Sequence, residues 1–122
     1  MPTIMEQPYP LEFVKKGNDI LLRLEEYDTV RTIVMTPDAK FSALPKTLLG
    51  RSKGMWDGDT LVVATDRIDW PYIDSSGLPQ GPSSSIVERF TPTADGTRLN
   101  LTMTITDPAA GMTSRFYRVS TY

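Results

Sequence analysis

A tight turn in the middle of the chain constrains the fold more than any other feature. Asp57 precedes Gly58, and this dipeptide is the strongest short-range signal for a β-hairpin, because such turns require positive φ at both central positions. The residues that follow alternate in polarity, as those of a half-buried strand do. The turn therefore predicts that residues 48–56 and 59–67 pair as antiparallel strands.

Further strand signals run along the whole chain, with Val, Ile, Thr, Tyr and Phe recurring between turn residues. Turns are expected at Gly17-Asn18 and at Asp95-Gly96. Residues 20–27 and 29–35 form one long bent strand or two short ones, and a short helix is expected around 43–48. The remaining predicted strands are 11–14, 86–91, 97–106 and 112–119, and the long loops are 36–46 and 68–85.

Seven to nine antiparallel strands joined mostly by short turns predict an up-and-down barrel or a two-sheet sandwich. Sequential hairpins favour the barrel. The chain has 122 residues, a length typical of one domain. We therefore expect an all-β fold, with residues 1–122 forming a single antiparallel up-and-down β-barrel of about eight strands. Such a barrel is just wide enough to hold a small ligand.

Two missing residue types exclude several kinds of chemistry. The chain has no Cys, which excludes disulfides, thiolate nucleophiles and sulfur-ligated metals. It also has no His, the commonest metal ligand and proton-transfer group near neutral pH. Catalysis would have to use Asp, Glu, Tyr, Lys, Ser, Thr or an external cofactor. We expect no metal and no resident cofactor.

The charge pattern bears on partners and location. The net charge is −2, from 13 basic and 15 acidic residues without a basic stripe, so no nucleic-acid partner is expected. No apolar run is long enough to cross a bilayer, so no membrane partner is expected either. Residues 1–6 lack the features of a signal peptide, which predicts a cytoplasmic location. A secreted protein trimmed of its leader would look the same.

The central turn also carries a family resemblance. Residues 49–65 contain Gly-Met-Trp-Asp-Gly-Asp-Thr-Leu-Val-Val, which resembles the Gly-x-Trp-(Glu/Asp)-Gly-Asp-Thr-Leu-Val-Val run of a family of uncharacterised bacterial proteins. The similarity extends to residues 9–13, 88–90 and 107–108, and so covers most of the chain. It implies a small lipocalin-like (calycin-type) β-barrel and no particular reaction.

The chain departs from that family at its histidines. Members of the family typically have His where Arg51 stands, and further His residues in the segment equivalent to 77–86. Here that segment contains Pro, Gln and Ser. Any site that the family builds from these histidines would be lost or replaced in this protein.

The first candidate site surrounds the turn. In one interpretation, Trp56 lines a ligand cavity and Asp59 anchors a polar group of the ligand. In the other, Trp56 plugs one end of the barrel, and Asp57 and Asp59 shape the turn. The second interpretation is favoured, because Asp is a common turn residue.

A second candidate site is the polar row Arg23, Glu25 and Tyr27. If this row faces inward, it binds a polar ligand group or supplies an acid and a base, because burial raises the pKa of a carboxyl group. If it faces outward, it is a solvated charge pattern. The outward orientation is favoured, because Ile20 and Leu22 offer a better core face.

Two more groups of polar and aromatic residues are candidates. One group lies where a strand enters the long loop, and its aromatic and acidic residues are typical of a binding lid. The spacing of its carboxylates matches no calcium-binding loop. Its members are Asp66, Arg67, Asp69, Trp70, Tyr72 and Asp74.

The other group lies on the last strands. Glu88 and Arg89 point to opposite faces, so only one of them can be interior. Arg115 and Tyr117 share a face and either fix a ligand inside the barrel or pair on its exterior. Exterior pairing is the favoured alternative.

Three functions remain open. We expect binding of a small hydrophobic or amphipathic ligand in the barrel, which needs no further assumption. The alternative is a cofactor-independent isomerase, lyase or hydrolase, with an Asp or Glu base and with Tyr or Arg stabilising developing charge. The third is a protein-interaction module, with homodimerisation as one case. An apolar cavity favours binding, whereas several inward ionisable groups in a cavity favour catalysis.

Overall fold

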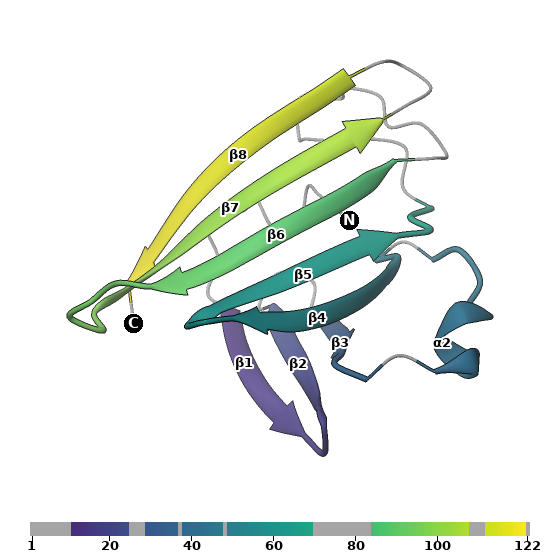
Figure 1. Cartoon of the computed structure of the whole chain (residues 1–122), viewed down its shortest axis with the longest axis horizontal. Helices are drawn as coiled ribbons and strands as arrows, with labels where there is room; N and C mark the ends of the chain where they lie inside the picture. Colours follow the sequence, from purple (N-terminus) through teal and green to yellow (C-terminus); the bar gives the residue numbers. More distant parts are fainter. Residues whose placement is uncertain are drawn as a thin grey trace.

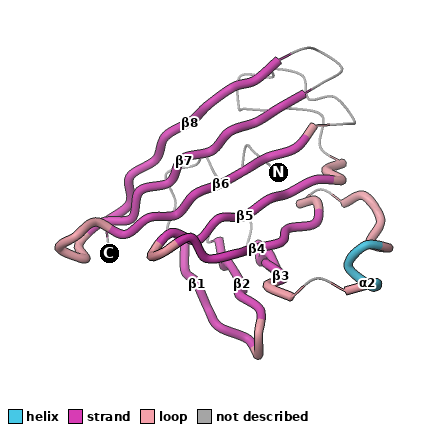
Figure 2. Tube along the Cα trace, in the orientation of Figure 1, coloured by secondary structure: helices cyan, strands magenta, loops and turns pink. Residues whose placement is uncertain are grey.

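The computed structural model describes residues 11–24, 29–36, 38–47, 49–69, 84–107 and 112–121, the last of these as backbone. It confirms an all-β fold, with one short helix within these ranges (Figures 1 and 2). The helix, α2, covers Ala39–Ser42. The strands are β1 Leu11–Lys16, β2 Asp19–Leu24, β3 Thr29–Val34, β4 Arg51–Asp57, β5 Thr60–Asp66, β6 Ser85–Pro92, β7 Arg98–Asp107 and β8 Met112–Thr121.

The eight strands form one sheet in chain order, β1 to β8. Strands β4 to β8 make one tilted layer, and β1 to β3 turn away beneath it, so that the sheet curls into a half-barrel (Figure 1). Pairing between β1 and β8 is absent from the described strands. The structure thus shows a curled antiparallel sheet and does not confirm the closed barrel.

One pair of neighbouring strands departs from up-and-down topology. Strands β3 and β4 are parallel, and they pair only at Ile33–Ser52 and Val34–Lys53 among the described residues. Parallel neighbours need a long connection to return the chain to the starting edge. The segment 35–50, which includes α2, provides that connection. The helix comes earlier than predicted, at Ala39–Ser42, and the segment 20–35 forms two short strands, which was one of the two predicted alternatives.

The central turn lies one residue later than predicted. Asp57 pairs with Thr60, so the two loop residues are Gly58 and Asp59. Gly58 has φ 61°, whereas Asp59 is not among the residues with positive φ. This is the pattern of a hairpin turn with glycine at its first central position, which needs only one positive φ. The predicted turn at Gly17-Asn18 is confirmed, with Gly17 at φ 60°.

Alternation along the strands places the core on the concave face of the sheet. In β7, Leu99, Leu101, Met103 and Ile105 are buried, as their spacing predicts. Strands β5 and β6 alternate in the same way and add Leu61, Val63, Ile86 and Phe90 to one cluster. Leu22 and Ile33 join this cluster from β2 and β3. The two arms of the half-barrel therefore share one apolar interior.

Candidate functional site

A cavity of about 490 Å³ lies at the end of the half-barrel that carries the central turn. Its walls come from both arms of the sheet and are almost entirely apolar. The lining residues are Phe13, Ile20, Trp56, Gly58, Asp59, Leu61, Phe90, Pro92 and Leu99. A cavity of this size, with few polar groups, is typical of small-molecule binding sites.

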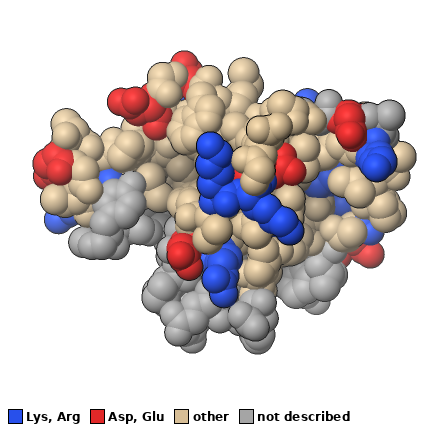
Figure 3. Space-filling view, turned by 90° about the horizontal axis from the view of Figure 1, so that it is seen from below, with Lys and Arg blue, Asp and Glu red and all other residues tan. Residues whose placement is uncertain are grey.

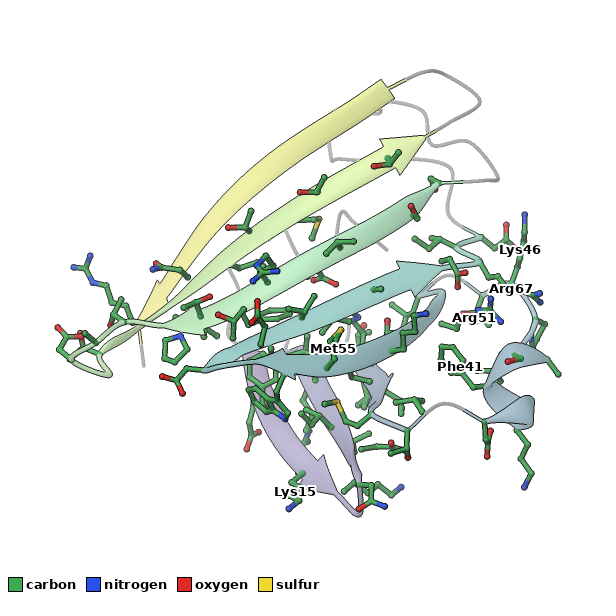
Figure 4. All side chains as sticks on the ribbon, in the orientation of Figure 1. Lys15, Phe41, Lys46, Arg51, Met55 and Arg67 are labelled. Atoms are coloured by element: carbon green, nitrogen blue, oxygen red, sulfur yellow. The ribbon has the colours of Figure 1, made fainter. Side chains whose placement is uncertain are left out.

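A second cavity of about 690 Å³ adjoins the first and has a more polar rim. Both cavities are lined by Phe13, Ile20 and Trp56, so they lie next to each other, and we call the two together the groove. The polar rim includes Lys15 and Asp19, and Figure 4 shows Lys15 near the end of β1. The side chain of Asp19 accepts a hydrogen bond from the Met35 backbone N–H at 3.1 Å.

Trp56 stands where the two cavities meet. Its side chain is 59% exposed, so it lines the groove without plugging the half-barrel. Beneath it, the rings of Phe13 and Phe90 meet edge to face, with their centroids 5.2 Å apart and an angle of 82° between their planes. This contact joins β1 to β6 across the groove, and edge-to-face pairs are favourable beyond their buried area.

Gly54 lines the second cavity, and its lack of a side chain leaves room for two neighbouring residues. A Cβ atom at this position would lie 2.6 Å from the Met35 sulfur and 2.7 Å from Cγ2 of Ile33. Real Cβ atoms do not approach other atoms so closely, so the missing side chain lets these two residues pack against β4. This explains why the Gly-x-Trp pattern puts a glycine two positions before Trp56 on the same strand face.

A polar network lies deeper in the half-barrel than the groove. The Nη1 and Nη2 atoms of Arg31 donate to the two carboxylate oxygens of Glu88 at 3.1 and 2.7 Å. Nη2 also donates to Ser52 Oγ at 3.2 Å and to Thr65 Oγ1 at 3.4 Å. The charged side chains of the pair are 1% and 0% exposed, and Arg31 Nε has no acceptor among the described residues. The network joins four successive strands, β3 to β6, across the curl of the sheet.

The structure confirms that Glu88 and Arg89 face opposite sides. Glu88 is buried in the network, and exposed Arg89 pairs with Asp57 at 2.8 Å. Arg31 was not predicted as a site residue. The sequence offered one indication of such a residue: if the side chain of Glu88 faces the interior, its carboxylate needs a buried cationic partner.

Of the polar row predicted on one strand, only Arg23 is described, and it is exposed, as the outward alternative requires. Glu25, Tyr27, Trp70 and Tyr72 lie outside the described residues. Arg115 and Tyr117 pair in register with Thr104 and Thr102. The side chains of these two β8 residues lie outside the described part of the chain.

Asp66 does not line the groove. It pairs with Arg51, which in turn donates hydrogen bonds to the α2 segment. Arg51 Nε donates to Asp66 Oδ1 at 2.6 Å, and Arg51 Nη1 donates to the backbone oxygens of Phe41 and Ser42. The Arg51 guanidinium also lies 5.3 Å from the centre of the Phe41 ring. The hydrogen bond from Arg51 lowers the pKa of Asp66, although partial burial of the carboxyl group acts in the opposite direction. Figure 4 shows Arg51, Phe41 and Arg67 gathered beside α2.

Charges of both signs share the surface. In the face seen in Figure 3, Lys and Arg gather near the middle and Asp and Glu flank them. The described residues contain no group of three or more carboxylates positioned to hold a metal ion. Within the same ranges, no helix has the length and apolar character needed to cross a membrane.

Comparison of the chain with protein-family models, with curated protein sequences and with solved structures finds no match. The family resemblance of the central motif therefore stays a hypothesis. What the geometry defines is a curled β-sheet with an apolar groove at one end and a buried ion pair behind it.

Proposed function

We propose that this protein binds a small apolar or amphipathic molecule in the groove. The observation that carries the proposal is the 490 Å³ cavity, walled on both sides by apolar side chains and open beside Trp56. Burying apolar ligand surface there would contribute about 25 cal/mol per Å² before the costs of association. In this proposal Trp56 and Asp59 contact the ligand, and the remaining walls exclude water from it.

Binding is favoured over acid–base catalysis by where the ionisable groups lie. The two ionisable side chains at the centre of the half-barrel, Arg31 and Glu88, already pair with each other, and neither lines the groove. A catalytic base must come within hydrogen-bonding distance of its substrate. A ligand in the groove would instead meet the exposed carboxylate of Asp59.

The proposal extends to the shape of the barrel. We propose that β1 and β8 approach each other to complete the eight-stranded barrel, which would wall the groove on all sides. The curl between β3 and β6 supports this closure, since it has already turned the sheet through half of a barrel.

The test is a pair of substitutions on β7. Leu99 lines the groove, and its neighbour Asn100 is exposed on the other face of the sheet. We expect the protein to bind the neutral dye N-phenyl-1-naphthylamine saturably. Leu99→Trp should weaken this binding by about fivefold to 150-fold, because overpacking a filled site costs about 1–3 kcal/mol, whereas Asn100→Trp should not weaken it. Circular dichroism checks that both variants fold.

Absence of saturable dye binding to the wild-type protein would overturn the proposal. Equal weakening by both β7 substitutions would overturn it too, since the dye would then sit elsewhere. Native mass spectrometry of the purified protein would identify any ligand that remains bound.

A further inference from the structure

The groove has an unbalanced charge at one end. Among the described residues, three charged side chains line it: Lys15 and Asp19 on the rim of the second cavity, and Asp59 beside the first. Lys15 and Asp19 offset each other within one cavity. The described lining of the first cavity includes no Lys or Arg. The net charge of the described groove residues is therefore that of Asp59.

Asp59 is also the carboxylate of the central turn that stays free in the described part of the molecule. Its neighbour Asp57 pairs with Arg89 at 2.8 Å on the outer side of the sheet. Asp59 is exposed and lines the cavity mouth. A ligand that enters past this residue would meet a carboxylate that is not paired with any of the described Lys or Arg side chains.

The same cavity is rich in aromatic rings. Phe13, Trp56 and Phe90 all line it, and the face of an aromatic ring carries negative potential that attracts cations. The cation–π interaction is strongest for Trp, and Trp56 is the most exposed of the three rings. Aromatic rings and a carboxylate together disfavour an anion and favour an organic cation.

We infer that the ligand is an amphipathic ammonium compound. This inference rests on the proposed function and names its ligand class. The ammonium group lies at the mouth between Asp59 and the Trp56 ring, and the hydrocarbon part packs inward against Phe90, Leu61 and Leu99. An alkyl carboxylate of the same length would bring a second negative charge beside Asp59.

The experiment compares four probes below their micellar concentrations: octyltrimethylammonium, octanol, octanoate and tetramethylammonium. The chain contains two Trp residues, so Trp70→Phe leaves Trp56 as the only indole reporter. Dissociation constants come from Trp56 fluorescence and, independently, from calorimetry. We expect octyltrimethylammonium to bind about threefold to thirtyfold tighter than octanol, and octanoate to bind weakest.

Two carboxylate variants give a matched comparison. Asp59→Asn should weaken octyltrimethylammonium binding by about twofold to fivefold and leave octanol binding unchanged, because Asn suits the same turn position. Asp57→Asn removes the same charge two positions earlier and outside the cavity lining, so it should change neither affinity. Added salt should shrink the preference for the cation.

The outcomes separate this inference from the proposed function. Equal binding of the three octyl probes, or tighter binding of octanoate, overturns the cation inference and leaves the binding function standing. If tetramethylammonium binds as tightly as octyltrimethylammonium, the hydrocarbon part contributes nothing to binding, and its placement inside the groove is wrong. Failure of every octyl probe to bind overturns both proposals.

Discussion

The buried ion pair makes a quantitative prediction about stability. Arg31 and Glu88 are paired through two hydrogen bonds, and their side chains are 1% and 0% exposed. Removing either partner leaves an uncompensated charge in the interior, which costs about 3–5 kcal/mol. We expect Arg31→Met and Glu88→Leu each to lower the free energy of unfolding by this amount. Domains of this kind are stable by only about 5–15 kcal/mol, so each loss is a large fraction of the total.

The double variant should behave differently from the sum of the single ones. Replacing both members of a buried pair by apolar side chains is often neutral or stabilising. Within the described part of the chain, Arg31 Nε also has no acceptor; such an unpaired buried group costs about 1–3 kcal/mol, and the double variant removes it. We therefore expect Arg31→Met combined with Glu88→Leu to be close to the wild-type protein in stability.

Urea denaturation followed by circular dichroism measures these differences. Arg89→Met is the matched control on the same strand, because it removes a surface pair with Asp57 whose side chains are 47% and 68% exposed. We expect it to cost less than about 1 kcal/mol. If the Glu88 variant costs no more than this control, or if the double variant loses the sum of the two single losses, the reasoning about the pair is wrong.

Two further predictions concern Gly54 and Asp95. Gly54→Ala should destabilise the protein by about 1–3 kcal/mol in urea denaturation, because the new Cβ meets the Met35 sulfur; a loss that Met35→Ala does not reduce would contradict this cause. The Thr93 hydroxyl is the largest cause that lowers the pKa of Asp95 to about 2, from an ordinary 3.8. A group whose pKa is lowered by folding contributes stability above its unfolded pKa, and this contribution disappears as the pH falls from about 4 to 2. Carboxyl NMR should therefore show a titration midpoint near 2 that rises in Thr93→Val, and an unchanged midpoint would exclude this hydrogen bond as the cause.

The core face was predictable where one side of a strand is apolar and the other polar. In β7, Leu99 and Met103 are buried while Asn100 is exposed, so the alternation alone separates the two faces. The opposite directions of Glu88 and Arg89 follow from the same rule of alternating side chains.

The ion pair was not predictable, because β3 lacks this contrast. Val30, Ile33 and Val34 place apolar side chains on both of its faces, so Arg31 has no clear direction in the sequence. Its partner Glu88 lies 57 positions away, and their contact depends on how strongly the sheet curls. The position of the central turn was missed for a local reason, because a glycine can take either central position of a two-residue turn.

The parallel contact between β3 and β4 also divides the sheet into two parts. Backbone pairing there is limited to two positions, whereas every other pair of neighbouring strands has at least five positions in register. The first three strands therefore contact the rest largely through side chains: Leu22 and Ile33 pack in the shared apolar cluster, and Arg31 pairs with Glu88. Such a unit is expected to open as a whole at a lower free energy than global unfolding. Because Phe13 and Leu61 line the groove from opposite sides of this junction, the same opening would widen the groove.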